Sequence, residues 1–117
     1  MNQIDHVGLF VKDLAKSIDF YEETLGLKVT NTMNFGESKI AFLDIGGGLL
    51  ELLERHDAAI NPPKGYWNHT AFKVDNYNET ISKLEKIGLE LRKMQVDNGS
   101  RIAFFKDPDG HDIEIME

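Results

Sequence analysis

The chain resembles itself at an offset of 63 residues, and this internal repeat constrains the fold more than any other feature of the sequence. Residues 5–11 (DHVGLFV) align with residues 68–74 (NHTAFKV), so that histidine falls on histidine and valine on valine. Two shorter matches follow, 40–42 on 102–104 at an offset of 62 and 50–52 on 113–115 at an offset of 63. A repeat at a fixed period indicates a structural unit that occurs more than once. We therefore expect two copies of one small unit.

Each copy is predicted to run from a strand through a helix to two or three further strands. In the first copy Asp13 is a plausible N-cap, and Gly26 is a plausible helix stop. Apolar residues recur between them at helical spacing, namely Leu14, Ile18, Tyr21 and Leu25. In the second copy Asn76 and Glu79 resemble a capping box, and Gly88 is the matching stop. Its apolar stripe consists of Tyr77, Ile81 and Leu84.

The sequence thus predicts an α+β fold of two tandem βαβββ modules that form one domain over residues 1–117. Module 1 spans about 1–56 and module 2 about 68–117, and the linker at about 57–67 contains Pro62, Pro63 and Gly65. A module of roughly 55 residues would struggle to bury a core alone. We therefore expect the two modules to pair their sheets face to face, within one chain or between chains.

Residues 107–110 (Asp-Pro-Asp-Gly) have the chemistry of a turn, because proline fixes φ and glycine supplies a positive φ. Three glycines, 46–48, occupy the corresponding place in module 1 and precede a strand rather than a helix. They are therefore not a phosphate-binding loop, and the chain also lacks HExxH, GxSxG and CxxC motifs. The sequence therefore contains no motif that would indicate a metalloprotease, a serine hydrolase or a dithiol enzyme.

Composition removes several further classes of function. The net charge of -7, with no segregated basic face, argues against binding to nucleic acid. The absence of cysteine excludes disulfides, zinc-thiolate sites and thiol nucleophiles. No apolar run approaches the ~18 residues of a membrane span, and the first residues lack the basic character of a signal peptide. We expect a soluble, cytoplasmic protein that acts on a small molecule, without nucleic acid or membrane partners.

Both modules carry a histidine on the first predicted strand and a glutamate on the last. Glu51 follows His6 by 45 residues, and Glu114 follows His69 by 45 residues. Imidazole together with carboxylate suits Zn, Ni, Co, Fe or Mn better than Ca. Four such ligands leave two positions of an octahedron for water or a chelating substrate. The spacing therefore predicts an open, catalytic type of metal site.

A structural interpretation of the same residues stays open. A single histidine in a strand is more commonly a structural residue than a ligand. The two glutamates lie among apolar residues, and burying a carboxylate there without a cation is costly, which favours the ligand interpretation. An outward-facing glutamate on an open sheet face is the alternative. His56 and His111 lack counterparts in the other module, so we interpret them as surface or loop residues.

The chain also resembles a known family, the vicinal oxygen chelate superfamily of glyoxalase I, bleomycin-resistance proteins and extradiol dioxygenases. The motifs are I-D-H-V-G-L-F-V-K-D-L-x3-I-D-F-Y at 4–21, F-Y-x3-L-G at 20–26, N-H-T-A-F-K-V at 68–74 and F-x-D-P-D-G-x3-E at 105–114. The resemblance covers essentially the whole chain and implies curved mixed sheets around a metal cavity. It places the ligands on the first and last strands of each module, at His6, Glu51, His69 and Glu114.

The ligand order His, Glu, His, Glu is similar to that of glyoxalase I, the lactoylglutathione lyase. This resemblance implies a metal-dependent 1,2-proton transfer in methylglyoxal detoxification, from a 2-oxoaldehyde–thiol hemithioacetal to a 2-hydroxyacyl thioester. It favours Glu114 as the carboxylate that moves the proton, with Glu51 able to act on the opposite face. The metal would be Ni, Zn, Co or Mn, the thiol glutathione or bacillithiol, and the assembly a homodimer.

The sequence departs from the glutathione-binding members at two positions. They usually have Arg four residues after the first histidine and Asn four after the first glutamate, whereas this chain has Phe10 and Arg55. Alternatives are an isomerase like methylmalonyl-CoA epimerase, a non-catalytic binding protein of the bleomycin-resistance type, and a dioxygenase. The epimerases usually carry Gln where this chain has Glu51, the binding proteins need no complete ligand set, and the dioxygenases use two His and one Glu.

Overall fold

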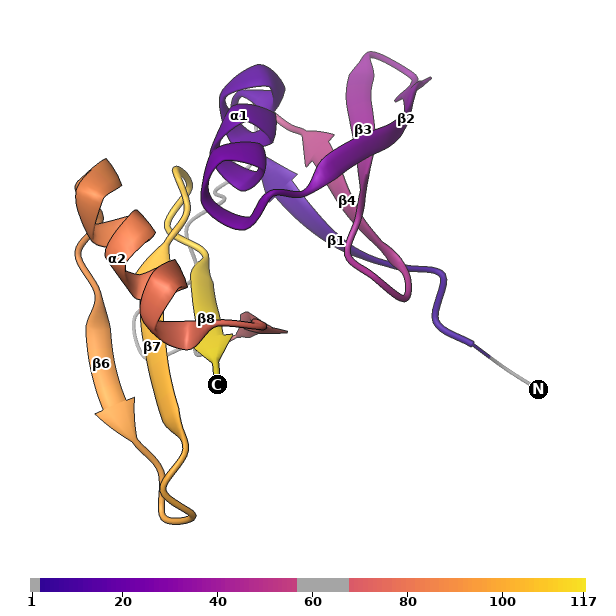
Figure 1. Ribbon diagram of the computed structural model, residues 1–117. Coiled ribbons are helices and arrows are strands. Elements are labelled where there is room, and N and C mark those ends of the chain that lie inside the picture. The colour runs from indigo at the N-terminus through magenta and orange to yellow at the C-terminus, as the bar shows by residue number, and fades with distance from the viewer. Residues whose placement is uncertain (1–2, 57–67) are drawn as a thin grey trace. The chain divides into compact units, whose positions relative to one another are not determined.

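The computed structural model describes residues 3–56 and 68–117 (Figure 1). The chain divides into two compact units, Met1–Ile60 and Asn61–Glu117. Each unit contains one helix and one four-stranded sheet. The predicted linker at 57–67 lies outside the described residues, and the pairing of the two sheets stays a prediction.

Unit 1 follows the order strand, helix and three strands. Its elements are β1 (His6–Val11), α1 (Leu14–Leu25), β2 (Lys28–Phe35), β3 (Ser38–Asp44) and β4 (Leu49–Glu54). The strands are ordered β1-β4-β3-β2 in the sheet. The first and last strands pair in parallel, and the other neighbours are antiparallel. This topology brings the two ends of the module into contact.

Unit 2 repeats this topology. Its elements are β5 (His69–Lys73), α2 (Tyr77–Ile87), β6 (Arg92–Gln95), β7 (Arg101–Lys106) and β8 (Asp112–Met116). The sheet order is β5-β8-β7-β6, again with a parallel pair of first and last strands. The predicted α+β fold of two βαβββ modules is therefore confirmed, with three strands after each helix. No helix among the described residues is long and apolar enough to cross a membrane.

Both helices begin and end where the sequence predicts. The Asp13 carboxylate accepts the backbone N–H of Lys16 at 3.1 Å, and the Asn76 side chain accepts that of Glu79 at 3.1 Å. These bonds satisfy donors that a helix leaves unpaired in its first turn. The C-caps, Gly26 and Gly88, have left-handed φ values of 67° and 98°, which glycine adopts without steric cost.

The buried side of α1 differs in part from the predicted apolar stripe. Leu14 and Tyr21 are buried as expected, whereas Ile18 and Leu25 are only half-buried. Ser17 and Thr24 are buried instead. Residues 14, 17, 21 and 24 recur at helical spacing on one face, so the small polar residues lie on the side that packs against β3 and β4. In α2 the predicted stripe of Tyr77, Ile81 and Leu84 is buried.

Each sheet has one face on which residues two positions apart along the strands are almost completely buried. In unit 1 the covered face contains Ala41, Leu43, Leu50 and Leu52, each at most 1% exposed. In unit 2 the fully buried strand residues include Ala103, Ile113 and Ile115. The intervening residues of each sheet point to the opposite face, and the predicted ligands are among them.

Candidate metal centre

Parallel pairing of the first and last strands explains the common spacing of 45 residues between histidine and glutamate. In unit 1 Gly8 lies opposite Glu51, so His6 is two positions before the partner of Glu51. In unit 2 Ala71 lies opposite Glu114, and His69 stands in the same relation to it. Side chains two positions apart on a strand point to the same face. Each His–Glu pair therefore shares one sheet face.

The side chains of each pair face one another through equivalent atoms. His6 Nε2 lies 3.8 Å from Glu51 Oε2, and His69 Nε2 lies 3.1 Å from Glu114 Oε1. The glutamate side chains are 21% and 12% exposed, and the histidines 40% and 29%. Each unit thus presents one imidazole nitrogen and one carboxylate from a partly sheltered surface.

A phenylalanine ring borders each pair at the same place in the sheet. Phe42 lies opposite Glu51 in the strand register, and its ring meets the His6 ring edge to face with centroids 5.5 Å apart. Phe104 lies opposite Glu114 and meets His69 in the same way at 5.7 Å. Such contacts favour one ring orientation. The sequence repeat aligned these phenylalanines, yet their place beside the histidines was not predicted.

Asp5 orients His6 from the other side of the ring. Its Oδ2 lies 2.8 Å from His6 Nδ1, so the Nδ1–H donates to the carboxylate and Nε2 is left to face Glu51. The hydrogen bond to Asp5 is the main cause that raises the pKa of His6 above 6.5, and the charge of Glu51 adds to it. Metal-binding histidines commonly donate their second N–H to a carboxylate in this way. The role of Asp5 was not predicted, although its place next to His6 in the sequence was a signal.

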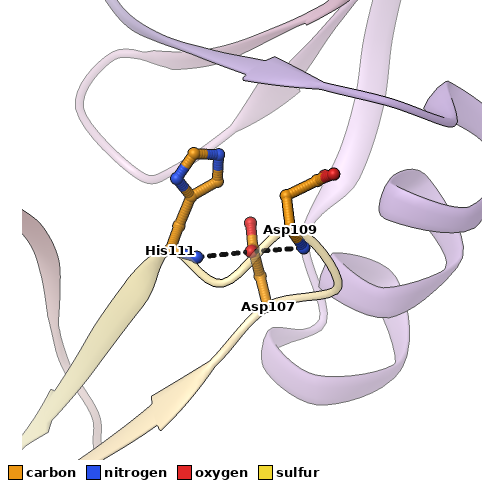
Figure 2. A group of neighbouring side chains, drawn as sticks. All are labelled: Asp107, Asp109 and His111. Carbon is orange, nitrogen blue, oxygen red and sulfur yellow. Dashed lines mark hydrogen bonds between the residues drawn. The ribbon is translucent and has the colours of Figure 1, made fainter. Parts of the chain in front are cut away.

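A second group of metal-type side chains lies in the turn between β7 and β8 (Figure 2). Single ligand atoms of Asp107, Asp109 and His111 lie within 4.8 Å of one another. Asp107 Oδ1 accepts the backbone N–H groups of Asp109 and His111 at 2.9 and 2.8 Å. Gly110, with a φ of 86°, donates its N–H to the Asp107 carbonyl at 3.0 Å. These are the bonds of the predicted turn, in which aspartate commonly serves as the acceptor.

The other two histidines lie where the sequence placed them. His111 is half-buried in the loop that leads into β8, and its backbone carbonyl accepts the N–H of Asp107 at 3.0 Å. The His56 side chain is 76% exposed and contacts Glu54 at 3.1 Å through Nε2. Neither histidine belongs to the His6–Glu51 pair or the His69–Glu114 pair.

The two positions that depart from the glutathione-binding pattern contact each other. The Arg55 guanidinium carbon lies 5.1 Å from the centre of the Phe10 ring, a cation–π arrangement. Both residues line a cavity of about 700 Å³ in unit 1, together with Glu37, Ser38, Leu53, Glu54 and His56. Phe10 lies opposite Leu53, two positions beyond the Gly8–Glu51 pair in the register, so the cavity continues the face that carries His6 and Glu51.

Unit 2 carries a group of charges beside its His–Glu pair. Asp112, only 9% exposed in its side chain, contacts Lys106 Nζ at 2.7 Å and Arg92 at 3.7 Å. The Arg92 guanidinium also stacks over Phe104 at 5.2 Å. Asp112 lies opposite His69 in the register and two residues before Glu114, so these charges lie on the same face as the pair.

Comparison with known proteins identifies relatives over nearly the whole chain. Residues 3–115 match the family model of the Glyoxalase/Bleomycin resistance protein/Dioxygenase superfamily. A lactoylglutathione lyase of Escherichia coli O157:H7 is 33% identical over 121 residues, covering 96% of this chain and 90% of that protein. The uncharacterized protein YwbC of Bacillus subtilis (strain 168) is 32% identical over 123 residues, covering 98% and 97%. A glyoxalase family protein from Enterococcus faecalis, 29% identical, superposes with a TM-score of 0.86 and covers 98% and 97%.

Proposed function

Because the chain belongs to the Glyoxalase/Bleomycin resistance protein/Dioxygenase superfamily, we propose that it is a metal-dependent lyase of the glyoxalase I type. Its substrate would be the hemithioacetal of methylglyoxal and a thiol, and its product the 2-hydroxyacyl thioester. The 33% identity to a lactoylglutathione lyase supports this choice within the family. Methylglyoxal detoxification in the cytoplasm would be its role.

One observation carries the proposal, namely that both units present a His Nε2 and a Glu carboxylate in the same strand register. Two such pairs, from one chain or from two copies in a homodimer, supply the four ligands His6, Glu51, His69 and Glu114. Two imidazoles and two carboxylates suit Ni, Zn, Co or Mn. The donor set of each unit therefore fits half of a divalent metal site.

When bound, the metal would stabilise the negative charge that develops on the two vicinal oxygens of the substrate as it becomes an enediolate. The proton transfer itself would be carried out by a glutamate carboxylate. Glu114 would accept the proton from the carbon that bears sulfur and return it to the neighbouring carbon, so that no proton is gained or lost overall. Glu51 would face the opposite side of the substrate. The apolar rings of Phe42 and Phe104 would limit the access of water to this chemistry.

The thiol part of the substrate would extend toward Phe10 and Arg55. A guanidinium binds a carboxylate through two parallel hydrogen bonds, which suits the carboxylates of glutathione or bacillithiol. Arg55 directly follows β4, and its backbone N–H donates to the Val11 carbonyl at 2.8 Å. The glutathione-binding relatives usually have their arginine on the neighbouring strand. We therefore expect a thiol cosubstrate whose carboxylates are arranged differently from those of glutathione, and we prefer bacillithiol to glutathione.

The test is isomerase activity on metal-stripped protein that is reconstituted in parallel with Ni, Co, Mn and Zn. Methylglyoxal is supplied with glutathione or with bacillithiol, and thioester formation is measured. We expect activity that depends on metal and is lost in Glu114→Gln. Activity that survives complete chelation would overturn the mechanism. Tight metal binding without turnover would redirect the search to epimerase substrates, and no metal binding would favour a small-molecule binding protein.

A further inference from the structure

Gly8 lies in the middle of β1, directly opposite Glu51, although strands disfavour glycine in their interior. The backbone does not require glycine there. The described glycines with positive φ are 26, 36, 46, 88, 99 and 110, and Gly8 is not among them. A glycine that no backbone angle requires commonly marks a close approach of another group. The group beside Gly8 is the carboxylate of Glu51.

A methyl group at position 8 would meet this carboxylate. A Cβ built on Gly8 lies 3.0 Å from Glu51 Oε1 and 3.9 Å from both Cβ and Cδ of Glu51. The nearest atom is the end of a flexible side chain rather than backbone. An alanine at this position would therefore displace the carboxylate by a few tenths of an ångström and leave the strand in place. Metal ligands tolerate deviations of only about 0.2 Å in their distances.

Unit 2 shows the other arrangement. Ala71 takes the place of Gly8 opposite the glutamate, and Glu114 Oε1 lies 3.1 Å from His69 Nε2. In unit 1, where the methyl group is absent, Glu51 lies over β1 and its Oε2 stays 3.8 Å from His6 Nε2. The two units thus differ in two respects. The residue opposite the glutamate is Gly8 in unit 1 and Ala71 in unit 2, and the carboxylate lies at a different distance from its histidine.

We propose that Gly8 is a positioning residue, which holds open the space that the Glu51 carboxylate occupies and thereby sets where this ligand meets the metal. The proposal rests on the proposed function, because it assigns Glu51 to a metal site. According to this proposal, the Glu51 carboxylate of unit 1 has more space to move than the Glu114 carboxylate of unit 2. Any side chain at position 8 would remove that freedom.

The experiment compares Gly8→Ala with Gly47→Ala as a matched control. A Cβ on Gly47 would meet nothing within 4 Å, and the Gly47 φ is not positive, so the same chemical change occurs there in open space. Three quantities are measured on both variants and the parent protein. They are metal affinity by chelator competition, the visible absorption spectrum of the Co(II) form, and the melting temperature.

We expect Gly8→Ala to lower the metal affinity about 10-fold, the scale seen when groups that orient a ligand are changed. Its Co(II) spectrum should change, and its melting temperature should not fall, because alanine is no worse than glycine in a strand. The Gly47→Ala protein should match the parent. Equal metal affinities and spectra for the parent and Gly8→Ala would overturn the proposal.

A crystal structure of metal-free Gly8→Ala separates this proposal from the proposed function. We expect its Glu51 carboxylate to move away from β1, relative to the parent. A carboxylate that stays in place would refute the positioning role, whatever the metal affinity is. A displaced carboxylate in a chain that binds no metal would keep the steric role of Gly8 and refute the metal site.

Discussion

The two units place a histidine and a glutamate in the same strand register, yet they hold the two pairs differently. His69 and Glu114 approach to 3.1 Å, and the Glu114 side chain is 12% exposed. His6 and Glu51 remain 3.8 Å apart, and the Glu51 side chain is 21% exposed. Identical topology therefore fixes which residues face each other, but the neighbouring side chains set the distance between them.

The surroundings of the two pairs differ as well. Opposite His69 lies Asp112 with its contact to Lys106, whereas the residue opposite His6 is Leu49. Asp5 binds the ring of His6, and the corresponding residue of unit 2 is Asn68. One pair is thus bordered by an ion pair on its own sheet, and the other is oriented by a carboxylate next to it in sequence. The two glutamates are not expected to be interchangeable.

The largest effect should come from exchanging each glutamate for its amide. We expect Glu114→Gln to lower kcat by about 10²- to 10⁴-fold, since it removes the group proposed to move the proton. Glu51→Gln should act mainly on metal affinity and lower kcat less at saturating metal. Steady-state kinetics with parallel metal titrations on both variants make the comparison. Equal losses of kcat would mean that the two units contribute equally to proton transfer, against the assigned roles.

A smaller effect should follow from removing the carboxylate that orients His6. We expect Asp5→Asn to weaken metal binding about 10-fold, because an amide accepts the Nδ1–H less strongly and fixes the ring less well. The reciprocal change, Asn68→Asp, should leave metal binding equal or make it tighter. Chelator competition on the two variants measures both affinities. An unchanged affinity in Asp5→Asn would show that the Asp5–His6 bond does not act on the metal.

The sequence allowed the helices and the His–Glu pairs to be predicted, because both depend on short-range or symmetric signals. Asp13 and Asn76 cap their helices through bonds to residues three positions on, so the local sequence is sufficient. The pairing of His6 with Glu51 followed from the same spacing in both halves. The parallel pairing of first and last strands then accounted for it.

Other features depend on side-chain packing that no spacing reveals. Ser17 and Thr24 are buried although they are polar, and the Thr24 hydroxyl donates to the Phe20 carbonyl at 2.7 Å. A hydrogen bond within the helix removes the cost of burying that hydroxyl. The distance between histidine and glutamate likewise differs between the two units, at 3.8 and 3.1 Å, although the strand register is the same. The spacing of residues along the chain does not determine such contacts.

The smallest expected effect concerns two other glutamates, Glu54 and Glu117, which follow the proposed ligands Glu51 and Glu114 by three residues. Glu54 accepts the backbone N–H of Leu14 at 2.8 Å, at the start of α1. Glu117 instead contacts the Arg101 guanidinium at 2.8 Å and accepts the Arg101 backbone N–H at 3.0 Å. These two bonds from Arg101 lower the pKa of Glu117 below its ordinary value of 4.5.

The sign of the resulting pH dependence follows from this lowered pKa. The folded state prefers ionised Glu117, so the pair adds stability above pH 4.5, and that stability is lost as the pH falls toward the lower folded pKa. Glu117→Gln should therefore lower the melting temperature slightly near neutral pH and leave it unchanged well below the folded pKa. Melting curves between about pH 3 and pH 7 measure the difference. A difference that grew as the pH fell would contradict this assignment, since an exposed ion pair can contribute only while its carboxylate is charged.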